Sequence, residues 1–254
     1  MRDQHVYLNG ISLEDAHPLI LLQHIDESAP EITTKTGERA GAPGQFVTAS
    51  TPTVREITIT FAVRERLDFT KRAEAVSAAA AWAMSGGWLS LSSRPGLRMW
   101  VIPEELPSVG RLRDWTDDIM LVLAAYDWPF WTEASANSVT LEGVENEDSA
   151  YISVPGTWDT RLEAVITSRN GALASAEISV GDQTMTLSGL SVAEDVPLRI
   201  WWDEHHLLRI EAAGTGLLGK RSGDDLVLKP GRHEVTVTVS TTCDVKLMAR
   251  GCYL

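Results

Sequence analysis

The sequence predicts a mainly β (α+β) protein of two domains, with one main helix in the first domain. Short segments in which apolar and polar residues alternate occur along most of the chain, and this alternation is typical of half-buried strands. One long segment, residues 69–84, has apolar residues at helical spacing instead. After the aromatic cluster "YDWPFW" (126–131) the composition changes from apolar to polar and acidic. We therefore expect one domain over residues 1–132 and a second over residues 133–254.

The overall composition is ordinary for a globular protein, with 44% hydrophobic and 22% charged residues among 254. No apolar run has the length needed to cross a bilayer, and the first residues lack a signal peptide's apolar core, so we expect no membrane partner. The net charge of -13 argues against a nucleic-acid backbone as the main partner. Cys243 and Cys252 are too few for a disulfide framework or a four-cysteine zinc site. We expect buried reduced thiols, with a cross-strand disulfide as the alternative.

Two segments near the N-terminus have contrasting patterns. Residues 34–46, "TKTGERAGAPGQF", predict an exposed loop or hairpin tip, because Gly and Pro recur among polar and basic residues. Residues 55–63, "REITITFAV", are the clearest strand in the chain. Their alternation predicts one buried face, formed by Ile57, Ile59, Phe61 and Val63.

The helix over residues 69–84 has recognisable ends. Asp68 can cap its first turn, and Gly86 and Gly87 stop it. We expect its buried face to consist of Phe69, Ala73, Val76, Ala80 and Met84. Strands are predicted afterwards at residues 88–92, 97–102 and 118–125. The last of these is apolar on both faces, which indicates burial on both sides or against a partner chain.

The second half has only strand-like patterns. We expect residues 132–150, which are polar and acidic, to be a linker. Residues 174–189 predict a hairpin with Gly181 and Asp182 in a two-residue turn. A turn at Lys229-Pro230-Gly231 precedes strict alternation through Val239, and residues 244–254 supply a final strand. Many short strands at this spacing predict a β-sandwich.

No segment predicts a catalytic, cofactor or metal site. Residues 203–206 (Asp-Glu-His-His) offer metal ligands, but adjacent strand residues point to opposite faces, so a hairpin turn explains them better. "GTGLLGK" (214–220) lacks the Ser or Thr that a phosphate loop requires after its lysine. Trp158, Trp201 and Trp202 are candidates for stacking on glycans, against the alternative that they fill the core of the sandwich.

The order of these segments resembles the distal tail proteins (Dit) of long-tailed bacteriophages. In the first half the matching pieces are "REITITFAV", the helix ending at Met84, "GGWLSLSSRPGLRMWVIP" and "DIMLVLAAYDWPFW". In the second half, "SGDDLVLKPGRHEVTVTV" resembles the family's strand–Pro-Gly–strand hairpin, and "MARGCYL" resembles its closing strand. The resemblance covers almost the whole chain, and it rests on the order of elements because no invariant catalytic motif anchors it.

This resemblance implies an N-terminal ring-forming (belt) domain and a C-terminal galectin-like β-sandwich. It implies a non-enzymatic virion protein that forms a hexameric ring at the phage tail tip and is assembled in the host cytoplasm. The implied partners are five further copies of the chain, the tail tube protein, the tape-measure protein and the tail-tip hub protein, with DNA only passing through. The residues expected at the ring interface are Lys35, Arg39, Arg55, Ile57 and Ile59.

Two other functions stay open at this point. The chain could be a carbohydrate-binding module or adhesin, whose sandwich binds host-surface glycans while the first domain serves as a mount. A hydrolase whose catalytic residues are scattered along the chain is a weaker third alternative. A ring predicts an assembly of about six chains, whereas a binding module predicts one or two.

Overall fold

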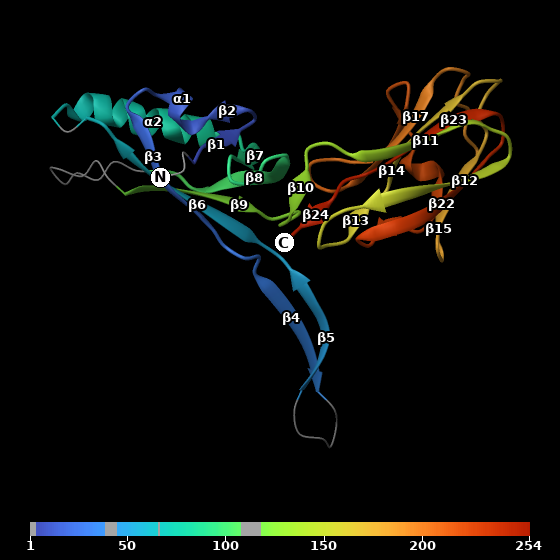
Figure 1. The fold of residues 1–254 in the computed structure, drawn as a ribbon, viewed down its shortest axis with the longest axis horizontal. Helices are drawn as coiled ribbons and strands as arrows, with labels where there is room; N and C mark the ends of the chain where they lie inside the picture. The colour runs from blue at the N-terminus through green and yellow to red at the C-terminus, as the bar shows by residue number, and fades with distance from the viewer. Residues whose placement is uncertain (1–3, 39–44, 66, 108–117) are drawn as a thin grey trace. The chain divides into compact units, whose positions relative to one another are not determined.

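The computed structural model describes residues 4–38, 45–65, 67–107 and 118–254 (Figure 1). The chain forms two compact units, one reaching to Trp131 and including Leu254, the other spanning Thr132–Tyr253. No helix among the described residues has both the length and the apolar character needed to cross a membrane. The prediction of a mainly β fold with one main helix is confirmed.

The first unit contains an antiparallel sheet in the order β2-β1-β7-β8-β9-β6-β3, with α1 and α2 together on one side of it (Figure 1). Its elements are β1 (Val6–Leu8), β2 (Ile11–Ser12), α1 (Leu13–Ala16), β3 (Ile20–Glu27), β4 (Ile32–Glu38), β5 (Gln45–Pro52), β6 (Arg55–Val63), α2 (Phe69–Met84), β7 (Gly87–Leu91), β8 (Leu97–Glu105) and β9 (Ile119–Ala125). Strands β4 and β5 pair only with each other, as a separate two-stranded ribbon.

Helix α2 begins and ends where the sequence predicts, but its buried face is different. Asp68 accepts hydrogen bonds from the backbone N–H groups of Thr70 and Lys71, and Gly86 follows the last turn with φ +60°. The predicted face is wrong at both ends, because Phe69 and Met84 are 53% and 63% exposed. The helix buries Val76, as predicted, together with Arg72, Ala75, Ala79 and Ala83. In so alanine-rich a helix, the large side chains do not determine which face fits closely against a sheet.

The second unit is a β-sandwich. One sheet has the order β11-β23-β14-β17-β18-β19, and the other has the order β12-β22-β15-β16-β20. Their strands are β11 (Asn137–Val144), β12 (Glu147–Val154), β14 (Glu163–Ser168), β15 (Ala176–Val180), β16 (Gln183–Leu187), β17 (Pro197–Trp202), β18 (Leu208–Ala212), β19 (Thr215–Gly216), β20 (Arg221–Gly223), β22 (Gly231–Val239) and β23 (Cys243–Ala249). Apolar residues from both sheets, such as Val237 and Leu247, form a common core.

Short elements complete this unit. The two-residue strands β13 (Thr160–Arg161) and β21 (Val227–Leu228) pair with each other, and β10 (Trp131–Glu133) pairs with β24 (Cys252–Tyr253). A 3₁₀ turn, η1, spans Leu218–Lys220.

Two further predictions are corrected here. Residues 132–150 are not a linker, because they belong to β10, β11 and β12. The segment is rich in polar residues because β11 and β12 are the end strands of their sheets and expose many of their side chains. Strands β21 and β22 do not form a hairpin, since β21 pairs with β13 and β22 with β12 and β15. Met120 of β9 is 53% exposed in the single chain, so burial of that position against a partner chain stays a prediction. The hairpin of β15 and β16 around Gly181 and Asp182 is as expected.

Candidate functional site: a projecting β ribbon and a polar sheet face

The ribbon of β4 and β5 extends away from the sheet of the first unit (Figure 1). Nearly all of its described residues are exposed, including three large apolar side chains. Ile32 is 65%, Val47 62% and Phe46 43% exposed. Each strand has one edge without a strand partner among the described residues. An isolated two-stranded ribbon with exposed apolar residues gains little stability alone, so this surface is suited to contact with another chain.

Within the ribbon, Phe46 lies over Gly37, its cross-strand partner. A Cβ atom built on Gly37 would lie only 2.7 Å from Cζ of Phe46, so the ring occupies the space that a side chain would take. The hydroxyl of Thr48 donates to the carbonyl of Lys35 at 2.9 Å, next to a bulge between Lys35 and Thr36. These local contacts hold the register of the ribbon.

The five residues expected at a ring interface do not lie together. Lys35 is exposed on β4, and Arg39 lies outside the described residues. Strand β6 is bonded on both sides, to β3 and β9, so it offers no free edge. Ile57 and Ile59 are fully buried and Arg55 is 5% exposed, so these three residues belong to the interior of the unit rather than to its surface. The sequence indicated the burial of Ile57 and Ile59 correctly, but it did not indicate that of Arg55 or reveal that their strand is central.

Arg55 is buried near an ion pair between Arg94 and Glu27, whose Nε and Oε2 atoms are 2.6 Å apart. Burial lowers the pKa of Arg55, and Arg94 lowers it further, while Glu27 opposes the shift. The guanidinium of Arg94 also lies 5.3 Å from the ring centroid of Trp131. The cluster therefore stabilises the end of the first unit at the base of the ribbon.

Residues 203–206 form the turn between β17 and β18, as the sequence indicated. Oδ1 of Asp203 accepts hydrogen bonds from the backbone N–H groups of His205 and Leu207, at 3.0 and 2.9 Å. Among the described residues, no group of three or more His, Cys, Asp or Glu side chains could hold a metal ion. Residues 214–220 form β19 and η1, not a phosphate loop before a helix. Cys243 and Cys252 are both buried and are not joined by a disulfide, and burial raises the pKa of Cys243.

The three candidate tryptophans do not form one surface. Trp201 and Trp202 are neighbours on β17 and therefore point to opposite faces of the sheet. Trp202 packs against the core, and Arg161 lies over its ring at 4.1 Å. Trp158 is half-buried in the loop after β12, where its backbone N–H donates to Cys252.

A different polar surface lies on the sheet that contains β12 and β22. Tyr151 is 54% exposed there, Arg232 lies over its ring at 4.1 Å, and Glu234 is its direct cross-strand partner. Sequence reasoning missed this surface, although the alternation of Ala150, Ile152 and Val154 with Tyr151 was a signal that the tyrosine points outward.

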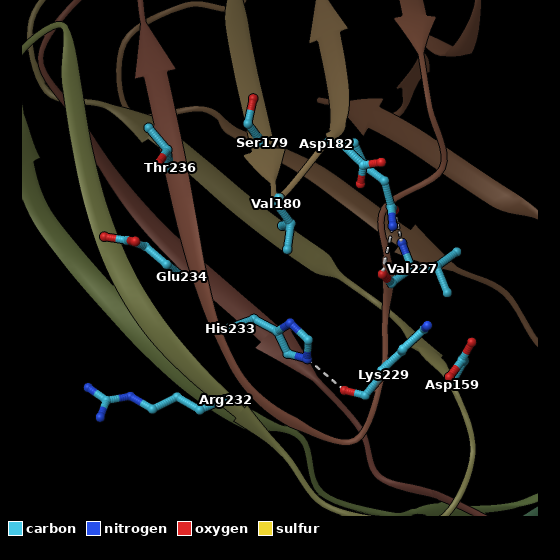
Figure 2. A pocket seen from close by; sticks show the side chains of 12 residues that line it. Asp159, Ser179, Val180, Asp182, Val227, Lys229, Arg232, His233, Glu234 and Thr236 are labelled. Atoms are coloured by element: carbon cyan, nitrogen blue, oxygen red, sulfur yellow. Dashed lines mark hydrogen bonds between the residues drawn. The ribbon is translucent and has the colours of Figure 1, made fainter.

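Beside this surface is a pocket of about 640 Å³ between β22, the β15–β16 turn and β21 (Figure 2). Asp159, Asp182 and Lys229 line its rim, and Nε2 of His233 donates to the carbonyl of Lys229 at 2.7 Å. The side-chain amide of Gln183 donates through Nε2 to the carbonyl of Val227 and accepts through Oε1 from the backbone N–H of Val227. These two hydrogen bonds join β16 to β21, which forms a wall of the pocket.

The fold of the chain is similar to that of solved phage tail proteins. It matches the Dit protein of phage SPP1, described as a paradigm of the hub adsorption apparatus in phages that infect Gram-positive bacteria, with a TM-score of 0.71 and 14% identity over 100% of both chains. It also matches a chain of the phage P2 baseplate in its activated conformation, with a TM-score of 0.53 and 6% identity over 98% of both chains. No family model matches the sequence, and no curated protein matches it. The predicted resemblance to Dit proteins is confirmed at the level of the fold.

Proposed function

We propose that this chain is a structural protein of a phage tail tip, where six copies form a ring that joins the tail tube to tail-tip, baseplate or receptor-binding proteins. The observation that carries this proposal is the match to the SPP1 Dit protein over the full length of both chains. The matched length includes both the first unit and the sandwich. This likeness supports a structural role rather than catalysis.

The ribbon of β4 and β5 is the proposed contact between neighbouring copies. Its apolar residues Ile32, Phe46 and Val47 need a covering surface. Lys35 and Glu38 are the charged residues of its two described strands, so the ribbon is close to neutral on a chain of net charge -13. A neutral arm can approach an acidic neighbour without the repulsion that the rest of the surface would cause.

The outer edge of β3 is the proposed second contact. Strand β3 ends its sheet and pairs only with β6, which leaves one row of backbone groups without a strand partner among the described residues. A head-to-tail ring needs two different and complementary surfaces on each copy, and a free strand edge can accept an extended segment from a neighbour. The tube and tape-measure proteins are the further partners that this role implies.

Replacing residues 33–51 with a short Gly-Ser linker tests the ribbon's role. We expect negative-stain images of the unaltered protein to show closed rings and those of the variant to show single particles. The melting temperature of the variant is expected to stay close to that of the parent, because the ribbon adds little to the core. Closed rings from the variant would rule out the ribbon as the ring contact.

A further inference from the structure

We propose that the outer face of the β12-β22-β15-β16 part of the sandwich, together with the adjacent pocket, binds a neutral oligosaccharide. This binding is independent of ring formation, since every residue involved lies in the second unit. The proposal rests on three features of this face: a row of hydroxyl groups, an exposed aromatic ring beside a carboxylate, and a pocket with an open strand edge.

The hydroxyl row crosses four strands. Ser149, Thr236, Ser179 and Thr184 are successive cross-strand partners on one face. Ser149 and Thr236 are 2.9 Å apart at their hydroxyl oxygens, and Ser179 and Thr184 are 3.0 Å apart. Each hydroxyl can both donate and accept, and a sugar's hydroxyl groups need the same combination of partners.

Tyr151 supplies the apolar part of the face. Its ring is more than half exposed on a sheet face that is otherwise polar, and Arg232 lies against it at 4.1 Å. The C–H face of a pyranose can pack on the face of an aromatic ring that is not covered, here the one opposite Arg232, while the ring's polar neighbours bond the sugar's hydroxyls. Glu234, directly opposite Tyr151, is an acceptor suited to two sugar hydroxyls, and Arg232 is a donor.

The pocket continues this face where β15 stops. The backbone N–H of Val239 bonds Asn146 on the β12 side, and that of Ser240 bonds Ser175 on the β15 side. Backbone groups of even-numbered residues in β22 therefore point toward β15. The pairing with β15 ends at Thr236. The backbone N–H and C=O groups of Arg232 and Glu234 therefore face the pocket instead of a strand.

The mixture of acidic and basic side chains around the pocket favours a neutral ligand. Asp159, Asp182 and Glu234 contribute three carboxylates, and Lys229 and Arg232 contribute two cations. A polyanion would meet the carboxylates and a polycation would meet the cations, whereas a neutral polyol can use both kinds of group. The pocket volume of about 640 Å³ is in the range of small-ligand sites.

Isothermal titration calorimetry with neutral tetrasaccharides of glucose, of galactose and of N-acetylglucosamine tests this proposal on the full-length chain. We expect saturable binding of at least one of them. Tyr151→Ala should weaken that binding by about tenfold or more, and Glu234→Gln by about threefold to tenfold. Tyr126→Ala is the matched control, because Tyr126 is a 45% exposed tyrosine in the first unit, and it should leave the affinity unchanged.

Three outcomes would overturn the proposal. One is the absence of saturable binding of all three sugars at millimolar concentration by protein that melts cooperatively. Another is an affinity that falls equally in the Tyr151→Ala and Tyr126→Ala variants. The last is binding of hyaluronate oligosaccharides alone, which would mean that the face selects an anionic ligand. Tyr151 is exposed, so we expect its variant to fold, and its melting temperature checks this.

Discussion

Oδ2 of Asp203 accepts a hydrogen bond from Nε of Arg209 at 2.7 Å and forms an ion pair with Nη2 of the same residue, also at 2.7 Å. The same carboxylate caps two backbone N–H groups of its own turn with Oδ1. Its side chain is only 9% exposed, so the turn between β17 and β18 depends on one nearly buried, ionised group.

Asp203→Asn should therefore destabilise the second unit, by about 1–3 kcal/mol, because it removes the charged acceptor shared by Arg209 and two backbone N–H groups. Glu204→Gln, at the next position of the turn and exposed, should change the free energy of unfolding little. Urea unfolding monitored by circular dichroism compares the two variants. Equal effects would contradict the role given to Asp203.

The carboxylate of Asp203 should also make the stability of the second unit depend on pH. Burial raises the pKa of Asp203, but hydrogen bonds from Leu207, Arg209 and His205 and the charge of Arg209 outweigh it, so the pKa lies below its ordinary value of 3.8. The unfolded chain therefore takes up this proton at a higher pH than the folded chain does. The stabilisation is fully present above pH 3.8 and is lost as the pH falls through the lower, folded-state pKa. The stability difference between the parent and Asp203→Asn should shrink over that window in acid titrations.

Ile59→Ala tests whether β6 is interior. Ile59 is fully buried between two bonded strands, so its truncation should cost about 2–5 kcal/mol. Ile32→Ala, at a 65% exposed position of the ribbon, should change the monomer's stability by less than about 0.5 kcal/mol. Thermal unfolding measures both variants. A small effect at Ile59 would mean that β6 is not held in the sheet as described.

Val47→Asp separates assembly from folding. A charge at this 62% exposed ribbon position should prevent association while leaving the melting temperature unchanged. Leu218→Asp, at a 50% exposed position of η1, is the matched control and should assemble normally. Sedimentation velocity distinguishes the two variants. The ribbon is not the contact if Val47→Asp sediments like the parent.

Gly156 and Gly171 provide a matched pair for backbone constraint. Both have positive φ, +117° and +76°. A Cβ at Gly156 would lie 2.3 Å from the carbonyl oxygen of Cys252, whereas a Cβ at Gly171 would have no heavy atom within 4 Å among the described residues. Gly156→Ala should therefore destabilise the sandwich clearly more than Gly171→Ala, which costs only about 1 kcal/mol for the left-handed backbone. Differential scanning calorimetry measures the difference, and equal losses would contradict the close approach of Cys252.

Local patterns were sufficient to predict the elements of the fold. The alternation in residues 55–63, the cap at Asp68 and the turn at Gly181 each act over a few residues, and each was predicted correctly. Pairing order depends on contacts between distant segments, so the central position of β6 and the separation of β21 from β22 were not evident. Polar end strands also lack a strong periodic signal, which explains why β11 and β12 were predicted as a linker.

The candidate sites were less predictable for a similar reason. The sequence indicated an exposed loop or hairpin tip at residues 34–46; residues 39–44 lie outside the described residues, and β4 and β5 flank them as a paired ribbon. It also favoured large aromatic residues as glycan contacts, yet Trp201 and Trp202 face opposite ways. The surface around Tyr151 is assembled from four strands, and only their register brings Tyr151, Glu234 and Thr236 onto one face.

The mass of the native assembly, measured by native mass spectrometry over a range of concentrations, tests the central claim most directly. A ring-forming hub predicts a closed species of about six chains of 27.8 kDa, which gives way to single chains when the ribbon is removed. A species of one chain at every concentration would contradict this account.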